Sequence, residues 1–172
     1  MDLSGRKEKI REWYTQSLHE QFNPFIKLWI SFNGWYKVKF PEETTDKKAI
    51  EACKHDAELL IYYQRSFSDG QFCDYINKLG VELERQPLEN LTRPRDKKLT
   101  LSKLEEENGE VSFLDNSSEA FDNYLDVIYR VRCNLFHCEK SPNSERDKLI
   151  VECAFKTLSI LMKQIIDTFQ GA

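Results

Sequence analysis

The sequence predicts an all-α protein, a helical bundle of about five helices in one domain spanning residues 1–172. Three observations support this fold class. Apolar residues recur at steps of three and four along most of the chain, the period of an amphipathic helix. No segment is recognisable as a strand. The length of 172 residues suits one domain with a sizeable core, and 40% hydrophobic with 31% charged residues is a globular composition.

Helices are expected throughout the first half of the chain. The first spans residues 3–22, and the second covers residues 25–36, with Asn23 as its N-cap and Pro24 in its first turn. Because the second segment is apolar nearly all round, we expect it to be the central helix of the bundle. Apolar spacing predicts two more helices, over residues 50–61 and 72–83.

The helical period lapses between residues 88 and 116. This stretch holds a basic run (residues 93–98) and an acidic run (residues 105–110), with few apolar residues. An aperiodic stretch of this length is usually either a functional loop or a mobile one. We interpret it as a long irregular loop of the same domain, because the chain on either side is too short for two cores. Its basic run is a candidate guide for RNA, although such runs are more often merely solvated.

The period returns after the loop. A helix is expected behind Ser117 and Ser118, and Ser144 is expected to cap the last helix, with Asp147 at the capping-box position. The last helix is apolar on more than one face, which predicts either deep burial or packing against a second subunit. The helix before it has an apolar stripe of Phe121, Leu125, Ile128 and Leu135.

The composition limits the function. The formal net charge of −4 has the wrong sign for coating nucleic acid, so any contact with RNA must be local. No apolar run approaches the roughly 20 residues needed to span a bilayer. The first residues lack the apolar core of a signal peptide. We therefore expect a cytoplasmic protein without membrane association, whose five cysteines are reduced.

Residues 128–137 concentrate the candidate chemistry. His137 follows Asn134 by three positions and Arg130 by seven, so an ideal helix places the three on one polar stripe, opposite the apolar stripe. Arg132 lies about 140° from His137 on such a helix, nearer the apolar side. If Arg132 is buried there it needs a partner. Alternatively, the helix loosens near its end and Arg132 reaches the same cleft.

These residue types suit phosphodiester cleavage without a metal. An imidazole titrating near neutral pH can exchange a proton with a ribose 2′-hydroxyl or a leaving oxygen. An arginine can bind the phosphate and an asparagine can orient either group. A zinc site at Cys133, His137 and Cys138 is disfavoured because no second pair of ligands lies nearby in sequence. We expect no metal and no cofactor.

The run IYRVRCNLFH (residues 128–137) and the tryptophan-rich segment FIKLWISFNGWY (residues 25–36) resemble the motif regions of HEPN domains (higher eukaryote and prokaryote nucleotide-binding), especially the Apea-like kind. The resemblance implies a homodimer with a shared cleft, and a metal-independent endoribonuclease in a toxin–antitoxin or phage-defence system. An antitoxin or a nucleotidyltransferase is the implied partner. By motif position Arg132 binds the phosphate and His137 is the catalytic imidazole, with Arg130 and Asn134 as substrate-binding residues.

A second function remains open. Active HEPN members often have Asn, Asp or His after the motif arginine and glycine after the histidine, whereas this chain has Cys133 and Cys138. HEPN domains without nuclease activity serve as binding modules. The alternative is therefore a catalytically silent helical module that binds a partner protein, a nucleotide or RNA.

Overall fold

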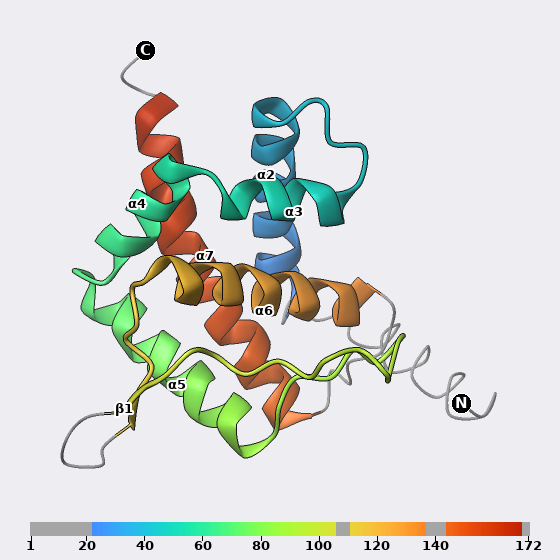
Figure 1. Ribbon diagram of the computed structural model, residues 1–172, viewed down its shortest axis with the longest axis vertical. Coiled ribbons are helices and arrows are strands. Elements are labelled where there is room, and N and C mark those ends of the chain that lie inside the picture. The colour runs from blue at the N-terminus through green and yellow to red at the C-terminus, as the bar shows by residue number, and fades with distance from the viewer. Residues whose placement is uncertain (1–21, 106–110, 137–143, 170–172) are drawn as a thin grey trace.

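The structure, a computed structural model, describes residues 22–105, 111–136 and 144–169. The helix expected over residues 3–22 lies outside this part of the chain, except for Phe22. The described residues form an all-α bundle (Figure 1), which confirms the predicted fold class. They comprise six helices, α2 (Asn23–Lys39), α3 (Asp46–Lys54), α4 (Ala57–Ser66), α5 (Gly70–Arg85), α6 (Ser118–Phe136) and α7 (Glu145–Phe169), and an antiparallel pair of short strands, β1 (Leu104–Glu105) and β2 (Val111–Ser112).

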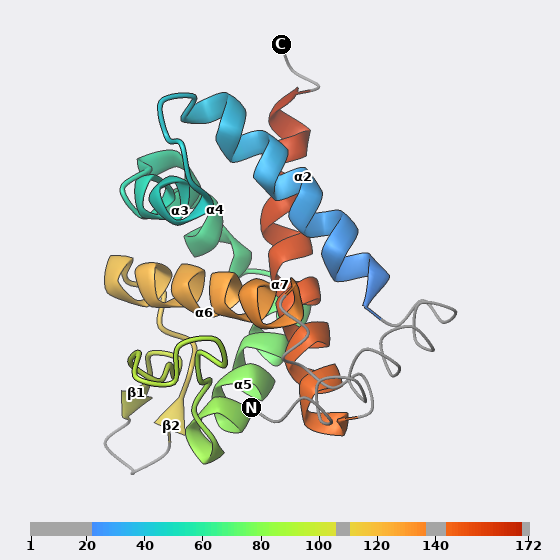
Figure 2. The ribbon, with the colours of Figure 1, turned by 90° about the vertical axis from the view of Figure 1, so that its right-hand side faces the viewer.

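Helix α7 is the central helix of the bundle. It packs against α2, α4, α5 and α6 and runs along most of the molecule in both views (Figures 1 and 2). Its side chains are buried along its length, among them Ile150, Leu158 and Ile165. The expectation of deep burial for the last helix is therefore confirmed.

Helix α2 covers one side of α7 rather than filling the centre. One stripe of α2 is buried, formed by Phe25, Trp29, Phe32 and Tyr36. On its outer side Ile30 is 62% exposed and Val38 is 83% exposed. The expectation that this segment is the central helix was wrong, because its apolar residues exceed what its neighbours can cover.

Short polar side chains set most of the helix starts. Asp56 accepts a hydrogen bond from the Leu59 amide at 2.8 Å and so begins α4 directly after α3. The single helix expected over residues 50–61 is for this reason two helices. Thr45 and Asp69 cap α3 and α5 in the same way.

The caps expected in the second half of the chain are confirmed, but the one at α2 is not. Ser117 accepts from the Ala120 amide and Ser144 from the Asp147 amide, each at 3.2 Å. At α2 the N-cap position belongs to Phe22, and Asn23 is the first helical residue. No side-chain cap bond forms there, and Pro24, which has no amide hydrogen, occupies the first turn as expected.

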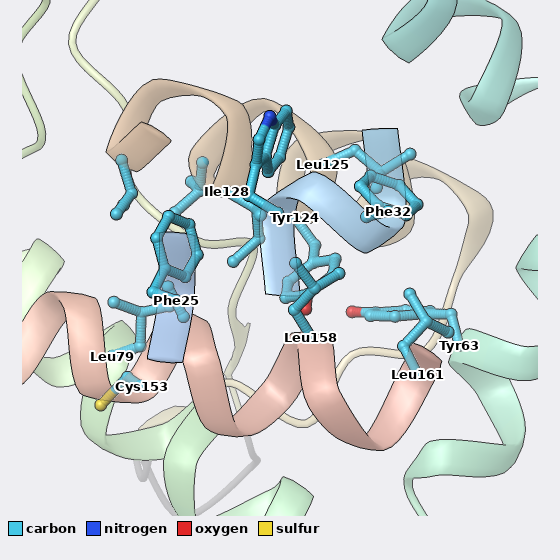
Figure 3. Close-up of a cluster of buried hydrophobic side chains, with 14 of the residues drawn as sticks. Phe25, Phe32, Tyr63, Leu79, Tyr124, Leu125, Ile128, Cys153, Leu158 and Leu161 are labelled. Atoms are coloured by element: carbon cyan, nitrogen blue, oxygen red, sulfur yellow. The ribbon is translucent and has the colours of Figure 1, made fainter. Parts of the chain in front are cut away.

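The core is one cluster to which the helices α2–α7 all contribute. Figure 3 shows side chains of α2, α4, α5 and α6 converging on α7, including Phe25 and Phe32 from α2 and Tyr124 and Ile128 from α6. The packing includes many edge-to-face ring contacts, such as Trp29 with Phe32 at 5.6 Å between centroids. Across the described part of the chain, no helix combines the length and apolarity that a bilayer crossing requires.

In the loop expected over residues 88–116, the described residues (88–105 and 111–116) contain no helix, as predicted, but their main chain is fixed to the bundle. Leu88 and Leu99 form an antiparallel bridge with N···O distances of 2.7 and 2.9 Å. The side chains of Leu88, Leu101 and Phe113 are buried in the core. In Figures 1 and 2 this segment, drawn in yellow-green, lies alongside α6.

Near its C-terminal end, the loop is held to α5 by a close contact between the Phe113 ring and Gly80. A Cβ built on Gly80 would lie 2.1 to 2.5 Å from three ring atoms of Phe113, far inside van der Waals contact. Only glycine at position 80 therefore lets the ring sit against the helix backbone.

We predict that Gly80→Ala lowers the free energy of unfolding by about 1–3 kcal/mol, because the added methyl group must displace the Phe113 ring. Gly34→Ala is the matched control, since a Cβ at Gly34 of α2 meets nothing within 4 Å. That variant should be neutral or stabilising by up to about 1 kcal/mol. Urea denaturation measures both. Equal stabilities for the two variants would contradict the Phe113 contact.

Candidate functional site

Helix α6 carries Arg130, Arg132 and Asn134, and its last residue is Phe136, so His137 lies outside the described residues. The helix is regular through Phe136. It does not loosen around Arg132, which excludes one of the two arrangements left open by the sequence. The side chains of Arg130 and Arg132 therefore leave opposite sides of α6, as an ideal helix requires.

Arg132 faces α2 and α3, where it forms the ion pair that a largely buried arginine requires. Its Nη2 lies 3.0 Å from Oδ2 of Asp46, the first residue of α3. The guanidinium carbon lies 4.7 Å from the ring centroid of Phe136 and 5.8 Å from that of Trp29. The side chains of Arg132 and Asp46 are only 21% and 23% exposed, so water screens this pair less than a surface pair.

Asp46 is itself held in place by α2. The Asn33 amide donates to Asp46 Oδ1 at 3.1 Å and also contacts the Tyr36 hydroxyl. Burial raises the pKa of Tyr36, and burial raises the pKa of Tyr129 to about 12, so both phenols remain neutral around the ion pair. The Arg132 guanidinium is consequently fixed by aromatic rings and by a carboxylate that the Asn33 amide holds in place.

One nitrogen of this guanidinium remains without a partner. Nε of Arg132 is buried, and no described residue accepts a hydrogen bond from it. A buried N–H without an acceptor is uncommon in folded proteins. The arginine therefore retains hydrogen-bonding capacity beyond its contact with Asp46.

Asn134 lies on the other side of α6 and is buried at 1% exposure. Its amide donates to the Glu89 carbonyl at 3.0 Å, and its Oδ1 accepts from the Leu91 amide at 3.5 Å. Asn134 therefore lies on the expected polar stripe with Arg130, but the loop after α5 covers the stripe at this point.

Two further side chains of the same stripe bind the loop backbone. Asn123 donates to the Thr100 carbonyl and accepts from the Ser102 amide, both at 2.8 Å. Arg130 Nη1 donates to the Lys97 carbonyl at 3.3 Å. Asn123 precedes Arg130 by seven positions and Asn134 by eleven, so each of these two lies within about 20° of Asn123 around an ideal helix. Asn123 was not among the residues predicted from the sequence, although its spacing from Arg130 indicates the same face of the helix.

A polar cavity of about 300 Å³ opens between the base of this loop and the start of α7. Asn134 forms part of its wall, together with Ser144 and Arg146 of the α7 N-terminus. Arg146 is held by Glu82 at 2.9 Å and by the Gln86 carbonyl. A volume of about 300 Å³ is at the lower end of the range for small-molecule sites.

The structure thus brings Arg130 and Asn134 together on the loop side of α6 and separates them from Arg132. Asp46, which no sequence pattern indicated, joins Arg132 from 86 positions away. Among the described residues, no group of three His, Cys, Asp or Glu side chains is arranged to hold a metal ion. The basic run over residues 93–98 of the same loop is exposed.

No family model, no curated protein and no solved structure matches this chain.

We predict that Asn134→Ala destabilises the protein by about 1–3 kcal/mol, because it leaves the Glu89 carbonyl and the Leu91 amide without their partner. Amide hydrogen exchange should accelerate around residues 88–91. Asn123→Ala is the matched control, since it frees the loop at residues 100–102 instead. If the two variants accelerate exchange over the same residues, the separate attachments described here are wrong.

Proposed function

We propose that the protein is a metal-independent endoribonuclease of the HEPN type, acting as a homodimer through Arg132 and His137. The observation that carries the proposal is the fixed guanidinium of Arg132 at the end of α6. Arg132 precedes His137 by five positions and is held by Asp46 and by aromatic rings, and its Nε has no acceptor among the described residues. A cation that is already oriented stabilises developing charge without reorganising during the reaction.

In the proposed reaction His137 removes the proton from a ribose 2′-hydroxyl. The 2′-oxygen attacks the adjacent phosphorus, and the bond from phosphorus to the 5′-oxygen breaks. Arg132 offsets the negative charge that develops on the phosphoryl oxygens. His137 of the partner subunit donates a proton to the leaving 5′-oxygen. The products are a 2′,3′-cyclic phosphate and a free 5′-hydroxyl, so atoms and charge balance without a metal.

The biological setting that this activity suits is a toxin–antitoxin or phage-defence system. An RNA-cleaving protein harms its own cell unless it is restrained, so an antitoxin or a nucleotidyltransferase is the proposed regulatory partner.

A second candidate is a silent helical module that binds a protein, nucleotide or RNA partner. The observation that favours it is the engagement of the site residues within the fold. Asp46 pairs with Arg132 at 3.0 Å, and Asn134 is buried against the loop backbone. In this alternative the same residues serve stability rather than catalysis.

We predict that the purified protein cleaves single-stranded RNA in EDTA and that the new ends carry 2′,3′-cyclic phosphate. His137→Ala should reduce the rate by a factor of about 10²–10⁴, the usual contribution of a general acid–base group. His55→Ala is the matched control, because His55 is exposed at the end of α3 and should leave the rate unchanged.

Labelled RNA resolved on a sequencing gel measures both the rates and the chemistry of the ends. Intact RNA after incubation with excess wild-type protein would favour the silent module. Cleavage that persists in His137→Ala would remove this histidine from the mechanism.

A further inference from the structure

We propose that the tip of the loop between α5 and α6 is a binding surface for the phosphate backbone of single-stranded RNA. Its residues are Arg93, Arg95 and Lys97, which we call the basic tip. The inference rests on the proposed function only for the identity of the polyanion. The surface itself follows from the charges and contacts of the described residues.

The cations of the basic tip are not neutralised by their neighbours. Two carboxylates lie close to the tip in sequence, and both have other partners: Glu89 pairs with Lys98, and Asp96 accepts from the Asn90 amide at 2.6 Å. Among the described residues, no carboxylate forms an ion pair with Arg93, Arg95 or Lys97, and all three are exposed. A concentration of free positive charge is unusual in a chain whose formal net charge is −4.

The basic tip is also held in one conformation. Asn90 Oδ1 accepts from the Thr92 and Arg93 amides at 3.2 and 3.1 Å, and the Leu88–Leu99 bridge closes the base of the loop. Arg130 of α6 fixes the Lys97 carbonyl at 3.3 Å. Binding to an ordered loop loses less conformational entropy than binding to a flexible tail.

The basic tip lies on the face of α6 that carries Arg130 and Asn134. The loop is attached to Asn134 at Glu89, before the tip, and to Arg130 at Lys97, at its end. Asn134 lies three positions before His137 in the sequence. In Figures 1 and 2 the loop lies along the same helix. An RNA strand bound at the tip would therefore lie beside the last turns of α6, on the side that carries Arg130 and Asn134.

The chemistry of the tip favours a single strand of RNA. Arginine can bind a phosphate with two parallel hydrogen bonds and can stack on an exposed base. Such bases are available in single strands and loops, whereas a duplex hides them. Because the rest of the surface is acidic overall, the attraction is local and should respond strongly to salt.

The test uses the full chain carrying His137→Ala, so that binding is measured without cleavage. The probe is a fluorescein-labelled 12-nucleotide single-stranded RNA in EDTA, followed by fluorescence anisotropy at several salt concentrations. Adding Arg93→Gln, Arg95→Gln and Lys97→Gln together should weaken binding at least tenfold at low salt. The slope of log K against log salt should fall by about 2, the value for three phosphate contacts in a single strand.

A charge-matched control removes three cations elsewhere. Lys37, Arg65 and Lys163 are exposed on α2, α4 and α7, and changing all three to Gln alters the net charge equally. This control should retain the Kd within about twofold, since log K depends on the phosphates contacted rather than on net charge. Equal weakening by both triple variants, an unchanged Kd in the tip variant, or no binding by the parent protein would overturn the proposal.

Two further measurements separate this inference from the proposed function. Polyglutamate that binds the tip as tightly as RNA would overturn the assignment to RNA. Cleavage by the otherwise native protein with a kcat/KM unaffected by the tip substitutions would overturn the tip surface and leave the nuclease standing. RNA binding that depends on the tip, without any cleavage by the native protein, would support the tip surface and overturn the proposed nuclease activity.

Discussion

The polar side chains of α6 must find partners, because this helix is packed on several sides. Nine of its residues are buried, Asn134 among them, and Arg132 is largely covered. Burying an unpaired charge or amide in such surroundings costs several kcal/mol of folding free energy. That cost is of the same order as the net stability of a whole domain. Asp46 meets this demand on one side of the helix, and the backbone of the loop after α5 meets it on the other.

This pairing explains how distant segments are brought to the motif. The ion pair with Asp46 fixes the start of α3 against the end of α6, while Asn123, Arg130 and Asn134 hold the loop along three turns. The loop therefore behaves as part of the scaffold, although its described residues form almost no regular secondary structure. A catalytic or binding constellation benefits from such support, since its groups must be held within a fraction of an ångström.

The sequence was sufficient for the fold class, because apolar period and caps such as Ser117 and Ser144 are local signals. It was insufficient for the surroundings of the polar stripe. A polar stripe facing water and one facing a loop backbone have the same helical period. The spacing of polar residues therefore could not indicate that Asn134 is buried. The partnership of Arg132 with Asp46 joins residues 86 positions apart, which one sequence cannot indicate. The break at Asp56 was missed because the apolar period continues across it.

The central claim is that α6 divides its polar residues between two faces, with Arg132 held by Asp46 and Arg130 held by the loop. A double-mutant cycle on the free energy of unfolding tests it most directly. Asp46→Asn combined with Arg132→Gln should show a coupling of about 1 kcal/mol, whereas Asp46→Asn combined with Arg130→Gln should be additive. Additivity in the first cycle, or coupling in the second, would contradict the arrangement.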